Sequence, residues 1–188
     1  RDIRNAPAFV EPDVFRTLQM LPGVQTTSDW SSALYVRGST PDQNLLMLDG
    51  ITVYNPYHLG GIFSTFNADA IKEADFRAGG FPARYGDKQS SVMDISLREG
   101  NYNNFETELE LSMGGAGLLA EGPIANGKGS YIASIRQSFL KYIIKSAGLT
   151  AVPEYWNSQM KAVYNIDSRN KLIFNAVTGS DYVKIEDE

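Results

Sequence analysis

Residues 105–113 place the tightest constraint on the fold, because apolar and polar side chains alternate there without a break. One face would carry Phe105, Thr107, Leu109, Leu111 and Met113, and the other Glu106, Glu108, Glu110 and Ser112. A period of two predicts a β-strand, and the length suits a tilted strand that crosses a membrane. Glutamates along one face are unusual for a soluble strand on a core. They fit a polar lumen behind a lipid-facing apolar face.

Four further strands are predicted after this one, at 116–124, 130–138, 157–166 and 171–178. Tight turns are expected at 126–129 and 167–170, and a long connection at 139–153 with a helical turn at 140–146. Short turns alternating with longer connections are typical of bacterial outer-membrane barrels. Five strands cannot close a barrel, and an open edge in lipid leaves backbone groups unpaired. We therefore interpret the chain as a fragment of a larger protein.

The first hundred residues are organised around the stretch 34–53. Two apolar strands, at 34–38 and 44–48, are joined by a polar connection that contains Pro41. The second is almost continuously apolar, so we expect it to be covered on both faces. Asp49-Gly50 then predicts a tight turn with positive φ, followed by a short strand at 51–53.

Helices and strands alternate around this stretch. Asp13 can cap a helix at 14–20, which Pro22-Gly23 would end. A short helix is expected at 63–71. Further strands are expected at 73–77 and 92–97. Short helices and strands in this order predict a compact α+β domain with a mixed sheet.

Four short motifs carry a family resemblance. They are Leu21-Pro22-Gly23-Val24, Tyr35-Val36-Arg37-Gly38, Leu46-Met47-Leu48-Asp49-Gly50 and Ala83-Arg84-Tyr85-Gly86. In order and spacing they resemble the plug domain of TonB-dependent outer-membrane receptors, over about residues 10–100. The resemblance implies an α+β plug domain with a mixed β-sheet at 1–103. Antiparallel β-strands of an incomplete transmembrane β-barrel would follow at 104–188. The sequences at 121–124 and 134–139 look most like those of receptors of the Bacteroidetes kind.

The resemblance also implies a function. Such a receptor binds an extracellular nutrient at the plug apex and imports it by energy-coupled movement of the plug. It lies in the bacterial outer membrane, with the plug inside the barrel lumen and facing the periplasm. Its partners would be a TonB-type energy-coupling protein, whose binding segment is not recognisable here, and a surface lipoprotein. Its substrate would be a small molecule, a glycan, a peptide or a metal chelate.

A second interpretation is a soluble periplasmic binding or signalling module built on a plug-like domain. In that case the strands after 105 form an ordinary sheet packed on the plug. The apolar face with Leu109, Leu111 and Met113 would then be covered by protein rather than lipid. The hydrophobic content of 43% is compatible with both interpretations.

Two groups of site residues follow from the resemblance. Loops at the plug apex would present the ligand-binding candidates Trp30, Tyr54, Asn55, Tyr57, His58 and Tyr85. Exposed loop aromatics suit sugars and chelates, although the same rings could simply pack the loops. Arg37 and Arg84 would contact the barrel wall, where Glu106, Glu108 and Glu110 offer carboxylates. The alternative for Arg37 is a surface arginine at a strand end.

Composition argues against several other classes of protein. The net charge is -5 and no basic patch interleaved with aromatics stands out, so nucleic acid is not an expected partner. The chain has no cysteine and one histidine, which leaves little room for a metal site. Ser39, Asp49 and His58 are the residue types of a hydrolase triad. No Gly-x-Ser-x-Gly nucleophile elbow accompanies them, so no enzymatic activity is expected. Asp29, Asp42 and Asp49 lack the spacing of a calcium loop, and no cofactor is expected.

Overall fold

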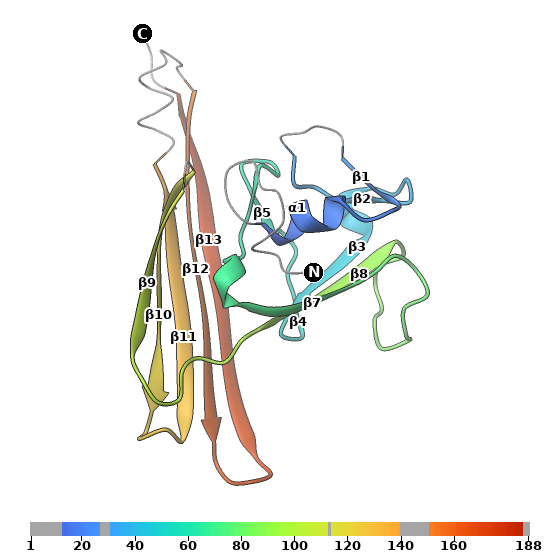
Figure 1. Cartoon of the computed structure of the whole chain (residues 1–188). Coiled ribbons are helices and arrows are strands. Elements are labelled where there is room, and N and C mark those ends of the chain that lie inside the picture. The colour runs from blue at the N-terminus through green and yellow to red at the C-terminus, as the bar shows by residue number, and fades with distance from the viewer. Residues whose placement is uncertain (1–12, 27–30, 113, 140–150, 186–188) are drawn as a thin grey trace. The chain divides into compact units, whose positions relative to one another are not determined.

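The computed structural model describes residues 13–26, 31–112, 114–139 and 151–185, and it divides the chain into two compact units (Figure 1). The units are Arg1–Leu97 and Arg98–Glu188. The first contains α1 (Val14–Gln19), β1 (Val24–Gln25), β2 (Tyr35–Val36), η2 (Pro41–Gln43), β3 (Asn44–Leu48), β4 (Ile51–Thr52), β5 (Tyr57–His58), β6 (Phe63–Ser64), η3 (Ala68–Ala70), β7 (Ile71–Arg77) and β8 (Ser91–Leu97). The second contains β9 (Glu106–Leu111), β10 (Gly115–Ile124), β11 (Gly129–Ser138), β12 (Ala151–Asn165) and β13 (Lys171–Ile185).

The main sheet of the first unit is mixed, as predicted, with strand order β4-β3-β8-β7. Strand β3 runs parallel to β8, with Leu48 opposite Ile95. Strands β4 and β7 are antiparallel to their neighbours. Two small antiparallel pairs, β1–β2 and β5–β6, complete the strands of this unit.

Strand β3 is covered on both faces, as its apolar run predicts. Leu45 and Leu46 point to opposite faces, yet both are buried, and so is Leu48. The adjacent strand β8 is similar, with Val92 and Met93 both buried. This central pair of strands therefore forms the core of the first unit.

Helix α1 begins where the sequence predicts. Asp13 is its N-cap, and Oδ1 accepts a hydrogen bond of 2.7 Å from the backbone N–H of Phe15. The second carboxylate oxygen, Oδ2, accepts from the N–H of Ser64 at 3.1 Å. Asp13 is itself buried. One side chain thus both starts the helix and ties it to β6.

Replacing Asp13 with alanine should destabilise the first unit by about 2–4 kcal/mol. Loss of the cap costs ~1 kcal/mol, and the stranded N–H of Ser64 adds ~1–3 kcal/mol. Urea unfolding followed by far-ultraviolet circular dichroism measures this change. Asp13→Asn is the matched control, because asparagine caps helices equally well and keeps one acceptor. A loss in Asp13→Ala no larger than in Asp13→Asn would contradict the assignment.

The turn between β3 and β4 has the predicted geometry. Asp49 has φ of 48° and Gly50 has φ of 84°. Positive φ at both central residues matches the twist of a two-residue hairpin. The carboxylate of Asp49 also accepts a hydrogen bond of 3.3 Å from the N–H of Leu97, at the end of β8.

The predicted helix at 63–71 is wrong. Strand β6 occupies its start, and the only helical part within it is η3, which Asn67 caps through a hydrogen bond from the N–H of Asp69. The hydroxyl of Ser64 donates to the carbonyl of Phe66, and that of Thr65 to the carbonyl of Pro56. Such local side-chain bonds compete with helix formation.

The strand predicted at 34–38 is shorter than expected. Only Tyr35–Val36 forms a strand, and this strand, β2, pairs with β1. Arg37 and Gly38 both have positive φ, at 52° and 82°, which ends the strand.

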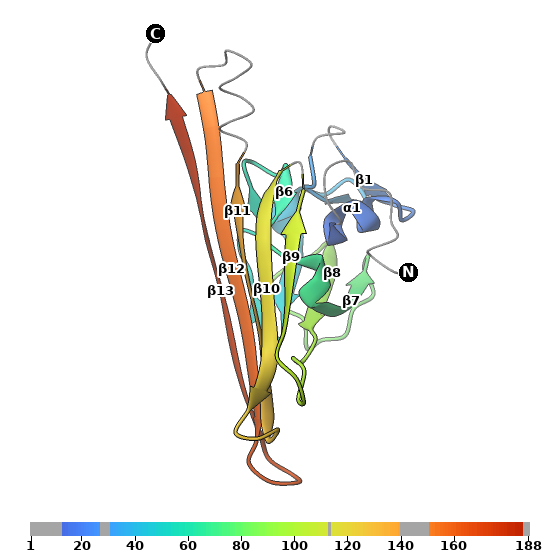
Figure 2. The ribbon, with the colours of Figure 1, turned by 60° about the vertical axis from the view of Figure 1, so that its left-hand side comes forward.

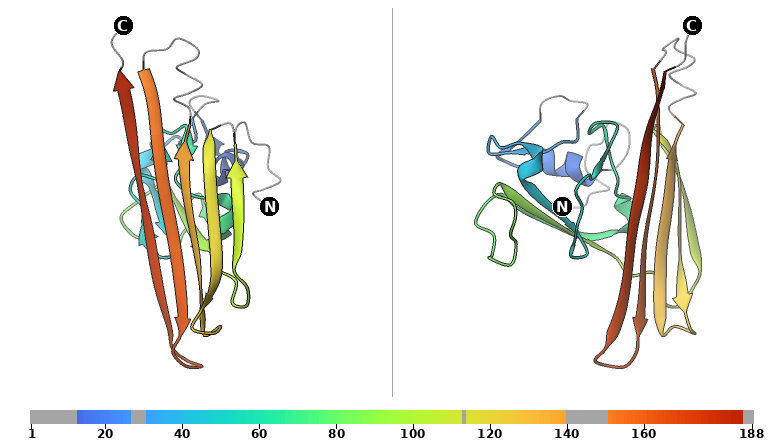
Figure 3. Two further views of the ribbon diagram at one scale, coloured as in Figure 1. Left: turned by 90° about the vertical axis from the view of Figure 1, so that its left-hand side faces the viewer. Right: turned by 180° about the vertical axis from the view of Figure 1, so that it is seen from behind.

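The second unit is a five-stranded antiparallel sheet in the order β13-β12-β11-β10-β9, so each strand pairs with its neighbours in sequence (Figures 2 and 3). The five predicted strands are all present, although β12 and β13 are longer than expected. The sheet is not closed, because β9 and β13 each pair with one strand among the described residues. The helical turn predicted at 140–146 lies outside the described residues. Of the helices that the structure describes, none has the length and apolarity needed to cross a membrane.

Candidate functional site

One face of the β9–β13 sheet is apolar and uncovered by the rest of its own unit. Strand register aligns Leu109, Leu118 and Ile135 in one row across β9, β10 and β11. Leu109 and Leu111 are 70% and 72% exposed. Other large exposed apolar side chains of this face are Phe105, Leu118, Ile135, Leu172, Phe174 and Tyr182. An apolar surface of this extent indicates a binding surface for protein or lipid.

Aromatic side chains lie toward both ends of this apolar face. On β12, Trp156 and Tyr164 are eight residues apart on the same face. At ~3.4 Å per residue they are separated by roughly 27 Å along the strand. Tyr131 lies one strand away from Tyr164 at the same end. A tilt of ~40°, as in outer-membrane barrels, shortens this separation to about 21 Å along the membrane normal, compared with an apolar band of ~25 Å between two aromatic girdles.

The opposite face of the sheet carries most of its charged and amide side chains, beside apolar ones such as Leu119, Ile132 and Val163. It carries Glu106, Glu108, Glu110, Glu121, Ser134, Arg136, Asn157, Gln159 and Lys161. Glu106 of β9 lies directly opposite Glu121 of β10. Two carboxylates in that position repel one another unless other groups compensate them.

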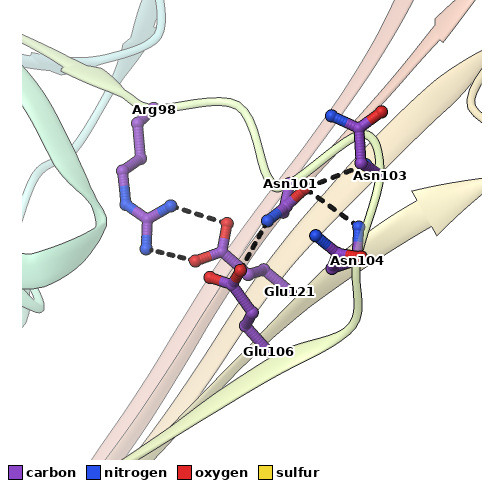
Figure 4. A network of polar contacts seen from close by, with 6 residues as sticks. All are labelled: Arg98, Asn101, Asn103, Asn104, Glu106 and Glu121. Carbon is purple, nitrogen blue, oxygen red and sulfur yellow. Dashed lines mark hydrogen bonds and ion pairs between the residues drawn. The ribbon is translucent and has the colours of Figure 1, made fainter.

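Compensation comes from residues 98–104, which we call the strap (Figure 4). Arg98 donates through both terminal nitrogens to the two carboxylate oxygens of Glu121, at 2.7 Å each. The side-chain amide of Asn101 donates to Glu106 Oε1 at 2.7 Å. Asn101 Oδ1 in turn accepts from the backbone N–H groups of Asn103 and Asn104, which fixes the turn into β9.

The strap also contacts β11 and β13. A Cβ at Gly100 would lie 1.9 Å from the carbonyl oxygen of Tyr131, so the backbone of the strap packs directly on β11. Glu99 accepts a hydrogen bond of 2.8 Å from Lys171 at the start of β13 and one of 2.5 Å from the hydroxyl of Tyr102. The strap is therefore bonded to, or packed against, four of the five strands.

These contacts predict a pH dependence. The hydrogen bond from Lys171, and then that from Tyr102, hold the pKa of Glu99 below its ordinary value of 4.5. A carboxyl with a lowered folded-state pKa stabilises the fold above its ordinary pKa, and that contribution is lost as pH falls through the folded-state value. Lys171→Met should therefore destabilise the second unit at neutral pH and have no effect once the pH is well below the lowered, folded-state pKa of Glu99.

The effect should be below ~1 kcal/mol, because the side chains of Lys171 and Glu99 are 42% and 36% exposed. Unfolding midpoints of the parent and Lys171→Met across the acid range measure it. A difference between the two proteins that does not change with pH would argue against this pairing.

The predicted ligand-binding residues differ in exposure. Tyr54 is 83% exposed, and Asn55 is exposed beside it. Tyr57 is half-buried, with its ring centroid 4.8 Å from that of Phe15, and burial raises the pKa of its hydroxyl. His58 and Tyr85 are buried, and Trp30 lies outside the described residues. Tyr54 and Asn55 are thus the candidates that solvent reaches most freely.

The two arginines predicted to meet the barrel wall both have contacts within the first unit. Arg37 is exposed, and its Nη1 lies 3.0 Å from where a Cβ of Gly79 would be. The guanidinium of Arg84 lies 4.7 Å from the ring centroid of Tyr85 and donates a hydrogen bond of 2.7 Å to its hydroxyl. Their pairing with Glu106, Glu108 or Glu110 stays a prediction.

One charged cluster was missed by the sequence analysis. Asp75 of β7 lies directly opposite Asp94 of β8. Arg77 binds Asp75 at 2.6 Å, while the hydroxyl of Tyr85 donates to Asp94 at 2.9 Å. The two acidic residues were visible in the sequence, but only strand pairing brings them together. Tyr85 consequently ties the loop after β7 to the sheet.

The residue types of a hydrolase triad serve local structure here. The hydroxyl of Ser39 donates to the carbonyl of Val36 at 2.7 Å, and Asp49 forms the β3–β4 turn. Within the described ranges, no three acidic or histidine side chains are grouped so as to hold a metal ion.

Comparison with known proteins gives a family match for the first unit. Residues 9–92 match the model of the TonB-dependent Receptor Plug Domain. No curated protein has a sequence that matches this chain.

Two solved structures share the fold, and both come from Pseudomonas aeruginosa. One is the siderophore receptor PirA, with a TM-score of 0.64 and 18% identity over 96% of this chain. The other is a mutant of the ferric enterobactin receptor PfeA in complex with enterobactin, with a TM-score of 0.56 and 18% identity over 91% of this chain. The chain spans about a third of each structure, 32% and 31%. The fold is therefore a plug domain followed by antiparallel strands of a barrel that these residues do not close.

Proposed function

We propose that this chain is part of a TonB-dependent outer-membrane receptor that imports a small molecule. The observation that carries the proposal is the combination of a plug domain with a sheet that is apolar on one face and polar on the other. A soluble sheet would cover its apolar face, whereas Leu109 and Leu111 are the most exposed leucines of the described chain. In a barrel that face meets lipid and the polar face lines the lumen.

The plug domain would close the lumen until ligand arrives. Ligand would bind at the loops that carry Tyr54 and Asn55, and a TonB-type partner in the inner membrane would then pull the plug to open a path. The rigid part of this arrangement is the β3–β8 core, whereas Tyr54 lies in an exposed loop that a ligand can reach. Ring stacking and an amide suit a planar chelate.

An iron chelate is the substrate class to test first, because both matching structures are siderophore receptors. Glycans and peptides are the other classes. The matching structures come from Pseudomonas aeruginosa and give no support to a receptor of the Bacteroidetes kind.

Uptake by cells that depend on the complete receptor tests this proposal. We expect uptake of a radiolabelled ferric chelate that stops when the proton-motive force is collapsed. Tyr54→Ala combined with Asn55→Ala should weaken chelate binding roughly tenfold, equal to ~1.4 kcal/mol. Met20→Ala, at another exposed position of the plug, is the matched control. Unchanged affinity for the chelate in the double variant would show that the ligand does not bind at this loop.

Cell fractionation tests the location separately. The receptor should be found in the outer-membrane fraction and should migrate as a folded barrel in unheated gels. Recovery from the periplasm without detergent would instead favour the soluble binding or signalling module.

A further inference from the structure

We propose that the strap is a mechanical stop, so that chain pulled out of the plug domain is released up to Leu97 and no further. The proposal rests on the proposed function, since it requires a partner that pulls. The boundary between the two compact units lies between Leu97 and Arg98. Arg98 is therefore the first residue of the second unit to receive a force transmitted along the chain.

Arg98 is well placed to carry that load. Its guanidinium makes two parallel hydrogen bonds of 2.7 Å to Glu121, a geometry that is among the strongest between side chains. The side chain of Glu121 is only 8% exposed, so water competes poorly for its oxygens. Release of Arg98 would also leave Glu121 opposite Glu106 without its compensating charge.

The residues behind Arg98 add further bonds. Glu99 is bound by Lys171 and Tyr102, Gly100 packs on the backbone of β11, and Asn101 binds Glu106. Because these contacts reach several strands, force on the strap is spread over the sheet rather than applied to one strand.

Most of the strands that the structure describes in the plug domain are short. β1, β2, β4, β5 and β6 are each two residues long, and the longest strands have seven. Strands so short contribute few ladder bonds. The sheet β9–β13 has strands of up to 15 residues. Within that sheet β9 has six residues, whereas β10 to β13 have ten to 15.

Single-molecule pulling on the complete receptor in a bilayer tests the stop. These 188 residues contain no cysteine, so Gln25→Cys gives a handle once any cysteines elsewhere in the receptor are replaced. Between residues 25 and 97 the extended chain measures roughly 250 Å at ~3.5 Å per residue. We expect extension to halt at that length and to dwell there.

Variants of the Arg98–Glu121 ion pair should change the dwell, which is the time for which extension halts at Leu97. Arg98→Ala should shorten it roughly 100-fold, as expected for breaking a largely buried pair. Arg98→Lys keeps the charge without the paired bonds and should fall between. Exchange of the charges in Arg98→Glu with Glu121→Arg should restore part of the dwell. Arg77→Ala, which removes an ion pair within the plug domain, should leave the dwell unchanged.

Absence of a halt at Leu97 in the parent, or the same dwell in Arg98→Ala and the parent, would overturn the proposal. If Arg98→Ala fails to insert, Arg98→Lys and the charge exchange still decide the matter. If the receptor takes up its chelate but extension does not halt at Leu97, the mechanical stop is overturned and the proposed function is not. A chain that never enters the membrane would overturn the proposed function instead.

Discussion

Gly100→Ala should destabilise the second unit by at least ~3 kcal/mol, near the upper end of what overpacking costs. The added methyl group would lie 1.9 Å from the carbonyl oxygen of Tyr131 and 2.5 Å from its carbonyl carbon. Both atoms belong to the backbone of β11, inside the sheet, so neither can move aside cheaply. The strap must lift from β11 instead, and the paired bonds of Arg98 to Glu121 would be strained or lost.

Urea unfolding of the folded receptor in detergent measures this effect. Gly86→Ala is the control, because no heavy atom lies within 4 Å of its added methyl group and its φ is not in the left-handed region. We expect that variant to match the parent within ~0.5 kcal/mol. Equal stability of Gly100→Ala and Gly86→Ala would show that the strap does not pack on β11.

Phe15→Ala should destabilise the plug domain by about 3–5 kcal/mol, the usual cost of deleting a buried aromatic ring. Phe15 has no exposed surface, and its ring centroid lies 4.8 Å from that of Tyr57 and 6.0 Å from that of Phe66. Its removal leaves a cavity where α1 meets β5 and the segment after β6, and the hydrogen bonds of Asp13 to the N–H groups of Phe15 and Ser64 keep the site from collapsing to fill it.

The control for Phe15→Ala is Met20→Ala at the end of the same helix. Met20 is 47% exposed, so this truncation should cost less than ~1 kcal/mol. Thermal unfolding of the two variants beside the parent distinguishes them. A loss in Phe15→Ala as small as that in Met20→Ala would mean that this ring is not part of the core.

Local signals in the sequence predicted much of the fold. Asp13, Gly23 and Asp49-Gly50 affect only residues close to them in the chain. The helix cap at Asp13, the helix end before Gly23 and the turn at Asp49-Gly50 are all where these residues predict them. The alternation at 105–113 predicted both the strand β9 and its faces, because side chains in a strand alternate regardless of its partners.

Contacts between distant residues were not predictable in the same way. Glu121 lies beside Arg98 only because β10 returns antiparallel to β9, and Asp94 meets Tyr85 only through the loop after β7. The helix predicted at 63–71 failed for a related reason. Thr65 is bonded to Pro56, and β6 pairs with β5, so tertiary contacts outweigh the local apolar pattern.

The candidate site shows the same division. The sequence pointed to aromatic residues between regular elements as ligand-binding candidates. In the structure the side chain of Tyr54 is exposed, whereas those of His58 and Tyr85 are buried. Periodicity in the sequence cannot make that distinction outside regular strands. The strap was not predicted, because its contacts depend on four strands that follow it in the chain.

Spin labelling along β11 in the complete receptor, reconstituted in lipid, tests most directly whether the apolar face of the sheet meets lipid. Single cysteines from 132 to 137 would each carry a nitroxide, and collision rates with oxygen and with a water-soluble nickel complex would be measured. We predict high oxygen collision rates at 133 and 135 and low rates at 132, 134 and 136, because Ala133 and Ile135 share the apolar face and Ile132, Ser134 and Arg136 share the other. High nickel accessibility at 133 and 135 would place the apolar face in water and contradict the membrane assignment.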